Sequence, residues 1–517
     1  MTPHAVAGAM APGPRRTMVT VCAMSATIMQ ALDTTIANVA LPYMQGSLSA
    51  SLDQINWVLT SYIVAAAIMT APIGWVADRF GRKKLFVICV AGFTVASLLC
   101  AVAQNIEQMV LFRLMQGGFG AALVPLSQAV MLDIYTPEER GSAMGIWGTG
   151  IMLGPIMGPT LGAWITDNYS WHWVFLINLP VGIVTAIGLV LFMDETESKA
   201  HLRFDWFGFI ALAVGIGSLQ VALDRGEQLG WLDSSEIVIE LIVAAIGFYY
   251  FFAHSLTTPQ PFVRFPVFYD RNYVGGCLFM IVIGFGLFGT MALVTPFMQN
   301  VMGYPILTAG ELLASRGVGT LVAMMTVGRL MRFVPPRYLV LAGLLGTAYA
   351  LHAMTGFTDQ TAPRTIVFYS VIQGLGLGLV FVPLNTVAFS TLPSHLRTDG
   401  TAILTLIRNF GSSIAISLVI ANLTRSTTVM HATLAEHVTA FNDALKMPDV
   451  ARALDLSTDL GRALLDQIVT QQASIIAYAN DFRLLTILTL CALPLVLIIG
   501  GMPRKRTQED EEAAVFD

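Results

Sequence analysis

The stretch QGGFGAALVPLSQAV, residues 116–130, occurs a second time in altered form as QGLGLGLVFVPLNTVAF, residues 373–389. Both copies begin with Gln-Gly, continue through small residues and then reach Pro-Leu. The segments that follow also match, with ERGSAM at 139–144 and LRTDGTAI at 396–403. GWVADRFGRKK at 74–84 has a degraded counterpart in GRLMRFVPPR at 328–337. Chance similarity between glycine-rich helices is the alternative, but several pairs in the same order favour two related halves.

The composition is that of a membrane protein. The chain has 517 residues, of which 55% are hydrophobic and 12% charged, about half the charged share of an average soluble protein. Apolar runs of about 20 residues, the length that crosses a bilayer core, recur along the whole chain. A membrane β-barrel would instead show alternating segments of about ten residues. We therefore expect an all-α polytopic membrane protein.

The apolar runs predict fourteen spans. They lie near residues 18–42, 54–77, 85–104, 107–131, 142–165, 173–193, 207–223, 235–255, 274–299, 306–328, 338–356, 364–391, 401–423 and 480–501. The first six spans resemble the last six, and the seventh and eighth form an extra pair between them. The predicted organisation is an N-terminal six-helix half (1–193), a linker with two extra helices (194–273) and a C-terminal six-helix half (274–517) that includes an outer loop (425–478).

A duplicated six-span unit is typical of a transporter whose binding site lies between two related halves. Basic residues set its orientation, because Lys and Arg are enriched in cytoplasmic loops. Most of the 28 basic residues fall in inner segments if the N-terminus is inside, which predicts that both termini are cytoplasmic. The outer segment 425–478 is too polar to span. We expect it to have structure of its own or to contact a partner, and a passive helical hairpin is the alternative.

Other functional classes find no support in the sequence. The five cysteines fall within apolar runs and fit small packing residues better than disulfides or metal ligands. No nucleophile–base set and no metal cluster is recognisable, so neither an enzyme nor a metal site is expected. GLGLG at 374–378 follows no strand, and no Walker-type phosphate loop occurs. ATP is therefore not the expected energy source, and no cofactor is predicted.

The stretch GWVADRFGRKK at 74–84 places an acid and several bases in one tight loop. Such a group of charges could separate and re-form when the two halves move. The alternative is a loop that only anchors the inner side of the membrane. The residues predicted for this cytoplasmic gating loop are Gly74, Asp78, Arg79, Gly81 and Arg82.

These motifs resemble a known family. GWVADRFGRKK resembles the signature loop between helices 2 and 3 of the major facilitator superfamily, and LFRLMQGGFGAA (111–122) resembles its helix-4 motif. LDTTIANVALP (32–42) is similar to the helix-1 motif of the fourteen-span drug:proton antiporters of the EmrB/QacA type, and features along the whole chain resemble EmrB most. GTGIMLGPIMGPTLGA (148–163) resembles the helix-5 antiporter motif, although Pro159 replaces one glycine. Its predicted motif residues are Gly150, Gly154, Pro155, Gly158 and Gly162.

The resemblance implies a major facilitator fold of twelve core helices plus two. It also implies efflux of hydrophobic or amphipathic small molecules across a bacterial inner membrane, driven by proton entry. Likeness to EmrB further implies a periplasmic membrane-fusion adaptor and an outer-membrane channel as partners. Two alternatives stay open: a dedicated exporter of one metabolite, siderophore or antibiotic, and a membrane sensor that no longer transports.

Asp33 lies inside the first apolar run, and a charge at that depth needs a functional reason or a partner. Counted from Pro42, Asp33 is roughly 13–14 Å below the outer boundary, and Arg113 is roughly 9 Å deep in the fourth span. We predict that the pair couples transport to protons, with a fixed structural ion pair as the alternative. The polar residues predicted to line the substrate cavity are Gln30, Asn38, Gln128, Trp147, Asn385 and Asn409.

Overall fold

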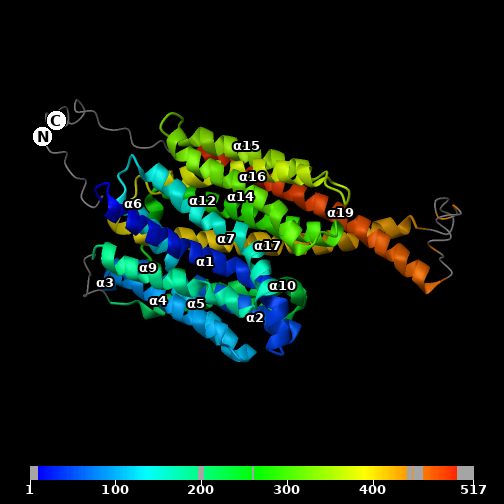
Figure 1. Ribbon diagram of the computed structural model, residues 1–517, viewed down its shortest axis with the longest axis horizontal. Coiled ribbons are helices and arrows are strands. Elements are labelled where there is room, and N and C mark those ends of the chain that lie inside the picture. The colour runs from blue at the N-terminus through cyan, green and yellow to red at the C-terminus, as the bar shows by residue number, and fades with distance from the viewer. Residues whose placement is uncertain are drawn as a thin grey trace.

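The computed structural model describes residues 10–195, 203–258, 261–438 and 458–497, together with the isolated positions 445, 447 and 454. The described residues form helices and no strands. The helices run side by side along the long axis of the molecule (Figure 1). The helices α4, α5 and α9 lie on one side of this bundle, and α15 and α16 lie on the other.

The first six predicted spans correspond to nine helices. They are α1 (Pro14–Ser47), α2 (Leu52–Thr70), α3 (Ile73–Phe80), α4 (Arg82–Ala101), α5 (Ile106–Gly120), α6 (Leu123–Ile134), α7 (Arg140–Asn168), α8 (His172–Leu176) and α9 (Asn178–Phe192). The predicted extra pair corresponds to α10 (Trp206–Leu229) and α11 (Ser235–Thr257), which pack against each other.

The C-terminal helices follow the same order as the predicted spans. They are α12 (Arg271–Gly284), α13 (Thr290–Pro296), α14 (Ile306–Leu330), α15 (Pro336–Met354), α16 (Pro363–Ala388), α17 (Arg397–Glu436) and α19 (Asp459–Cys491). Two π-helical turns, η3 (Phe285–Gly289) and η4 (Phe297–Val301), continue the helical path beside α13. The short 3-10 turns are η1 (Trp231–Asp233), η2 (Phe265–Tyr269), η5 (Ser394–Leu396) and η7 (Leu493–Leu497).

Two predicted single spans are broken helices. The second span divides into α2 and α3, which meet at an angle of 58°, and the fourth divides into α5 and α6. Pro72 lies at the first break and Pro125 lies four residues after Ala121 at the second. Proline lacks a backbone N–H and its ring clashes with the carbonyl four residues earlier, which accounts for both breaks.

The count of fourteen membrane spans is not confirmed. Among the described residues, ten helices are long and apolar enough to cross a bilayer, or eleven if the bent pair is one span. The helices α7, α14 and α15 occupy predicted span positions but are more polar. α7 is rich in glycine, α14 carries Glu311 and Arg316, and α15 carries Arg337 and His352. Arg316 is buried, whereas Glu311, Arg337 and His352 are exposed near the ends of their helices.

The helices α17 and α19 extend past the other helices at one end of the bundle (Figure 1). They pack against each other, and His431 Nε2 lies 3.0 Å from Asp466 Oδ1 across the pair. The described parts of the predicted outer segment, up to residue 438 and from residue 458, are therefore mainly continuations of two helices. The rest of that segment lies largely outside the described residues.

The predicted inner segments share the opposite end of the bundle. Arg15 Nη2 at the start of α1 lies 2.5 Å from Asp194 Oδ1 after α9, and Arg16 Nη1 lies 2.8 Å from Glu139 Oε2 before α7. The hydrogen bond from Arg16 holds the pKa of Glu139 below its ordinary value. These contacts place the ends of three predicted spans together, as the alternation of inner and outer loops requires.

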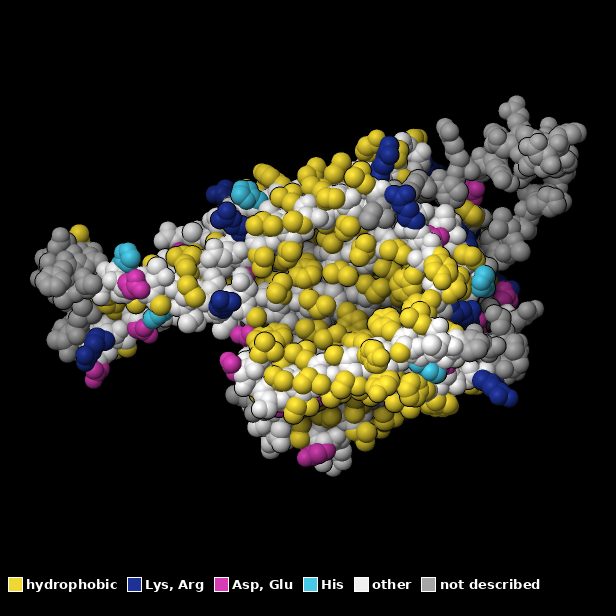
Figure 2. Space-filling view, turned by 180° about the vertical axis from the view of Figure 1, so that it is seen from behind, with side chains coloured by type: hydrophobic (Ala, Val, Ile, Leu, Met, Phe, Trp, Pro, Cys, Tyr) yellow, Lys and Arg dark blue, Asp and Glu magenta, His cyan; other side chains and the backbone are white. Residues whose placement is uncertain are grey.

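The surface follows the same axis. On the face seen in Figure 2, hydrophobic side chains cover the middle of the molecule and most charged side chains lie toward its two ends. Large apolar side chains such as Val184, Leu191 and Tyr249 are more than half exposed on α9 and α11. An apolar belt between charged ends is the arrangement expected of a protein surrounded by lipid.

Candidate functional site

Asp33 and Arg113 form a buried ion pair. Arg113 Nη1 on α5 lies 2.7 Å from Asp33 Oδ2 on α1, and both side chains have no exposed surface. The depth calculated from the sequence for each residue is thus compatible with the contact observed. Buried charges in proteins are generally paired, because an isolated one is costly.

Polar side chains that the sequence analysis did not select complete this group. Gln116 Nε2 donates to Asp33 Oδ1 at 2.7 Å, and Asn178 Nδ2 donates to the same oxygen at 3.1 Å. Both amides also donate to Ser97 Oγ, at 3.2 Å and 3.0 Å. Gln116 Oε1 in turn accepts from Arg113 Nη1 at 2.7 Å. We call Asp33, Arg113, Gln116, Ser97 and Asn178 the Asp33 network.

The remaining contacts of Arg113 hold its guanidinium in one place. Its Nε donates to the carbonyl of Val58 at 3.0 Å. The guanidinium lies 4.2 Å from the centre of the Tyr62 ring and 5.7 Å from that of Phe175. Aromatic faces attract a desolvated cation. The Asp33 network therefore joins helices α1, α2, α4, α5, α8 and α9 into one electrostatic unit.

Hydrogen-bond donors surround the Asp33 carboxylate. The Asp33 carboxylate accepts hydrogen bonds from three donors, the side chains of Arg113, Gln116 and Asn178. This arrangement suits the ionised form of Asp33, which can only accept hydrogen bonds. A proton on Asp33 would leave Arg113 without its counter-charge and displace at least one donor. Neither charged side chain of the pair is exposed, so both are shielded from solvent in this arrangement.

The glycines of α7 place this helix directly on α1. A Cβ at Gly154 would overlap with the carbonyl of Ala31, and one at Gly158 would overlap with Thr35 Oγ1. Thr35 Oγ1 donates to the carbonyl of Gly154 at 2.9 Å. A Cβ at Gly150 would lie 2.9 Å from Met24 Cε, and one at Gly162 would lie 3.0 Å from Ile36 Cγ1. The fifth residue of the motif, Pro155, is also buried in α7.

The residues of the predicted gating loop lie at the end of the bundle that holds the predicted inner segments, and charged groups there join the two halves. Asp133 of α6 contacts Arg82 at the start of α4, and its other oxygen lies 2.6 Å from Arg397 Nη1 at the start of α17. Gly81 has φ of 89°, in the region that favours glycine, and so forms the turn between α3 and α4.

A second charged group is centred on Arg264, which the sequence analysis did not select as a site residue. Arg264, after α11, contacts Asp78 of α3, and its Nε lies 3.3 Å from Asp399 Oδ2 of α17. Burial works against the charge of Arg264, but attraction to Asp399 and the hydrogen bond to Asp78 raise its pKa. A Cβ at Gly74 would overlap with Asp399. Arg79, the residue after Asp78, is half-buried.

Three of the predicted cavity residues, Gln128, Trp147 and Asn385, are buried where the two halves contact each other. Gln128 Nε2 of α6 donates to Asn385 Oδ1 of α16 at 2.8 Å. Trp147 of α7 stacks on Phe381 of α16, with ring centres 6.1 Å apart and planes inclined by 19°. These contacts join the N-terminal and C-terminal helices. The structure does not bring the other three together in this way: Gln30 and Asn409 are half-buried on α1 and α17, and Asn38 is exposed on α1.

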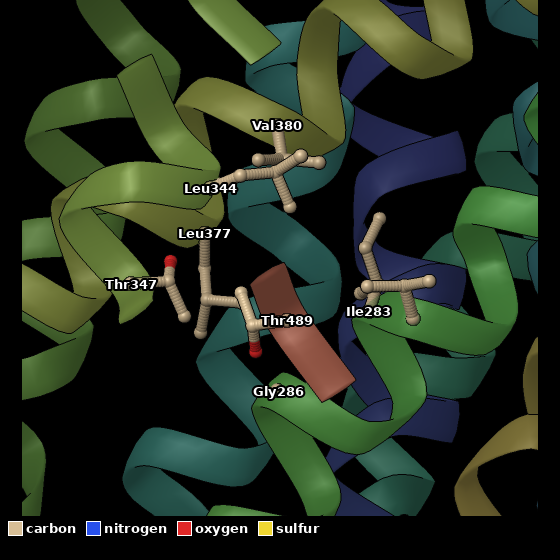
Figure 3. Close-up of a pocket in the computed structure, with 8 residues that line it drawn as sticks. Ile283, Gly286, Leu344, Thr347, Leu377, Val380 and Thr489 are labelled. Atoms are coloured by element: carbon tan, nitrogen blue, oxygen red, sulfur yellow. The ribbon is translucent and has the colours of Figure 1, made fainter. Parts of the chain in front are cut away.

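The C-terminal half contains an uncharged counterpart of the Asp33 network. Gln373, which matches Gln116 in the repeat, donates through Nε2 to Thr290 Oγ1 at 2.9 Å and to the carbonyl of Gly286 at 3.2 Å. Beside it, a small cavity lies between α12, η3, α15, α16 and α19, lined by aliphatic side chains together with Thr347 and Thr489 (Figure 3). The repeat thus places a charged network in one half and an apolar cavity in the other.

Two helical halves that contact each other through charged, polar and aromatic side chains, with a buried ion pair inside one half, define a multi-pass membrane transporter. Comparisons with known proteins agree. The family model described as Major Facilitator Superfamily matches residues 23–416. A multidrug export protein EmrB of Haemophilus influenzae is 33% identical over 496 residues, covering 94% of this chain and 96% of the relative.

A fatty acid resistance protein FarB of Neisseria gonorrhoeae is 33% identical over 478 residues, covering 91% of this chain and 93% of the relative. Among solved structures, the proton:xylose symporter XylE superposes with a TM-score of 0.58 at 13% identity, covering 96% of this chain and 98% of that one. The chain belongs to the Major Facilitator Superfamily and, within it, to the EmrB-type drug:proton antiporter family.

Proposed function

We propose that this protein exports hydrophobic and amphipathic small molecules across a bacterial inner membrane in exchange for protons, by alternating access. The observation that carries the proposal is the Asp33–Arg113 pair, which is fully buried within the membrane-crossing bundle. Ionisable residues at membrane depth mark ion pathways more often than structural needs, because burying them is unfavourable. The names of the EmrB relatives supply the cargo class.

Protonation of Asp33 is the coupling step of this proposal. It removes the negative charge that balances Arg113, and the donors around Asp33 have to rearrange. The change reaches α7 through its glycine contacts with α1. It then passes to the other half, because α7 packs on α14 where Gly145 lies against Met324 and Gly328 lies against Ser142. Opening the inner end also requires the ion pairs of Asp133 with Arg397 to separate.

The proposal is tested by substrate-induced proton release. Purified protein in detergent is mixed with a hydrophobic cationic dye, and released protons are followed with a soluble pH indicator. We expect the wild type to release protons and Asp33→Asn to release none while still binding the dye. Asp233→Asn removes an exposed acid and should behave as wild type. Proton release from Asp33→Asn equal to that of the wild type would place the coupling site elsewhere.

We further propose that both termini face the cytoplasm and that the outward helices α17 and α19 contact a periplasmic adaptor that leads to an outer-membrane channel. A cysteine at Glu436 should react with a membrane-impermeant thiol reagent in intact cells, and a cysteine at Lys84 should not. Deletion of residues 425–478 should abolish resistance in cells but leave proton release in detergent. Full resistance without this segment would exclude adaptor docking.

A dedicated exporter of one amphipathic compound is the second candidate, and the FarB relative supports it by its name. A deletion strain tested against a panel of toxic compounds separates the candidates. Sensitivity to many compounds supports multidrug export, sensitivity to one compound supports the dedicated exporter, and sensitivity to none supports a sensor. The intact Asp33–Arg113 contact argues against the sensor, which would have no need of it.

A further inference from the structure

A second acid is buried among the helices, in the C-terminal half. Asp481 lies on α19, and none of its surface is exposed. Its Oδ1 accepts a hydrogen bond from Asn422 Nδ2 of α17. Its Oδ2 is also buried and has no hydrogen-bond partner among the described residues. A buried ionisable side chain in a membrane helix needs a functional reason, and the export mechanism proposed above does not use Asp481.

The surroundings of Asp481 are aromatic and aliphatic. Tyr478 and Leu485, three residues before it and four after, share its face of α19, and both belong to a buried hydrophobic cluster. The ring of Tyr478 packs edge-on against Phe297 of η4, with ring centres 5.2 Å apart. Side chains of this kind cannot compensate a negative charge.

No cation balances Asp481 within the described part of the chain. Its one hydrogen-bond partner there is an uncharged amide. The elements that pack against α19 include η3, α13 and η4, which contain no titratable residue, and the helices α15 and α17. The titratable residues in the outer part of α15 and within two turns of Asn422 and Asp481 are Tyr349, His352, Arg425, Tyr478 and Arg483. All of them except Tyr478 are exposed, so none places a buried positive charge beside Asp481.

This arrangement suits the neutral form of the Asp481 carboxyl group. The carboxylate of Asp33 is stabilised by a guanidinium and two amides, whereas an ionised Asp481 would have one amide donor. A buried charge without a partner is so unfavourable that the group takes up a proton instead. The two buried carboxyl groups therefore favour opposite protonation states, because their surroundings differ.

Asp481 lies at the base of the two helices that extend past the bundle (Figure 1). Its partner Asn422 is 25 residues from Arg397 at the inner end of α17, which is about 37 Å at the rise of an α-helix. The hydrocarbon core is about 30 Å thick, so the contact lies near the outer boundary of the membrane. Separation of α17 from α19 at this level would bring the carboxyl group into contact with water.

We propose that Asp481 is a second proton-binding site, which carries a proton while α17 and α19 pack as they do here and loses it when the two helices separate. The O–H bond of the carboxyl group then breaks, the proton passes to water, and water hydrates the carboxylate. Alkaline solution at this end of the protein therefore favours the separated helices. The site goes beyond the proposed export function and does not rest on it, because the Asp33 network lies in the other half.

Infrared spectroscopy tests the protonation state directly. The full chain is purified in dodecyl maltoside, which has no carbonyl group, and the carbonyl bands of protonated carboxyl groups are recorded near neutral pH. We expect Asp481→Asn to remove one band, because asparagine replaces the neutral carboxyl group by an uncharged group of the same shape. Asp459→Asn, which removes a fully exposed acid from the same helix, should remove none. An unchanged spectrum in Asp481→Asn would show that the group is ionised and would overturn the proposal.

The same measurement can be made without any variant. Wild-type protein labelled with carbon-13 in the side-chain carboxyl group of aspartate should show the isotope shift in at least one band of a protonated carboxyl group. The absence of a shifted band would overturn the proposal even if Asp481→Asn failed to fold.

Distance measurements test the link between the proton and the two helices. Spin labels are attached to cysteines at Thr428 of α17 and Gln472 of α19, both exposed, in protein that carries Cys491→Ser. We expect the wild type to gain a population with a longer distance as the solution becomes alkaline. Asp481→Asn cannot ionise and should keep the short distance throughout, whereas Asp459→Asn should follow the wild type. A longer distance that appears at the same pH in Asp481→Asn as in the wild type would overturn the proposal.

The two proton sites can be tested separately. Asp33→Asn should keep the infrared band assigned to Asp481, because the two acids lie in different halves. Asp481→Asn should keep the dye-induced proton release, because Asp33 is unchanged. Loss of the Asp481 band in Asp33→Asn, or loss of proton release in a folded Asp481→Asn, would contradict the independence of the two sites.

Discussion

Removal of Arg113 alone should destabilise the protein more than removal of the whole ion pair. The substitution Arg113→Met introduces an apolar side chain but leaves Asp33 buried, with Gln116 and Asn178 as its remaining donors among the described residues. Breaking a buried pair on one side typically costs about 3–5 kcal/mol, because a charge is left uncompensated. Asp33→Asn should have a cost of the same order, since it strands Arg113.

The double variant Asp33→Asn/Arg113→Met contains no buried charge in this network. Replacing both members of a buried pair is often close to neutral, so we expect it to be more stable than either single variant. The coupling energy should therefore be large and favourable, as is usual for residues in direct contact. The double variant should be the more stable one because both side chains are fully buried, so that either single substitution leaves an unpaired buried charge.

A thiol-reactive fluorescent dye measures the unfolding of these variants, because Cys22, Cys89, Cys100 and Cys277 are buried and react only when helices separate. Cys491 is exposed, so all variants should carry Cys491→Ser. Arg364→Met, which removes an exposed arginine at the start of α16, controls for the loss of charge itself. If the effects of the two single substitutions add in the double variant, the pair is not an energetic unit and the reasoning fails.

Three further predictions follow from other contacts. Gly154→Leu should overlap with the α1 backbone, lower stability by about 1–3 kcal/mol and abolish export, whereas Gly46→Leu, which has nothing within 4 Å, should do neither in the same dye and resistance assays. Asp133→Asn removes the acid shared by two arginines and should increase the inward-open population measured as spin-label distances between inner helix ends. The hydrogen bond from Arg16 lowers the pKa of Glu139 below its ordinary value of 4.5. The ionised Glu139 therefore stabilises the folded protein above pH 4.5, and this stabilisation disappears as the pH falls through the lowered pKa. The difference in unfolding free energy between wild type and Glu139→Gln should vanish at that lower pH.

The sequence predicted the Asp33–Arg113 contact because helix rise is nearly constant, so depth along a span can be counted from either end. Gln116 could have been found by the same reasoning, since it lies one turn after Arg113 on the same face. Ser97 and Asn178 could not. Their contribution depends on how α4 and α9 rotate about their own axes, which is set by packing against several neighbours at once.

Some helix boundaries could likewise be predicted from the sequence, and others could not. Pro72 and Pro125 mark the broken spans and are visible in the sequence. The continuation of α17 and α19 beyond the bundle was ambiguous, because a polar helix and a polar loop have similar composition. Contacts between the halves, such as Asp133 with Arg397, belong to one conformation of a protein that must have at least two. Periodicity and motif spacing carry no information on which conformation forms them.

The two halves share the repeated sequence motifs but distribute charge differently, and this difference suggests how the cycle is driven. Gln116 and Gln373 occupy matching positions in the repeat, and both donate to the first predicted span of their half. In the N-terminal half the acceptor is the carboxylate of Asp33, and in the C-terminal half it is the hydroxyl of Thr290. A proton can therefore change the charge of the N-terminal network but not of its counterpart. A change of charge in the Asp33 network can reach the C-terminal half only through the helix contacts between the halves, such as those of α7 with α14.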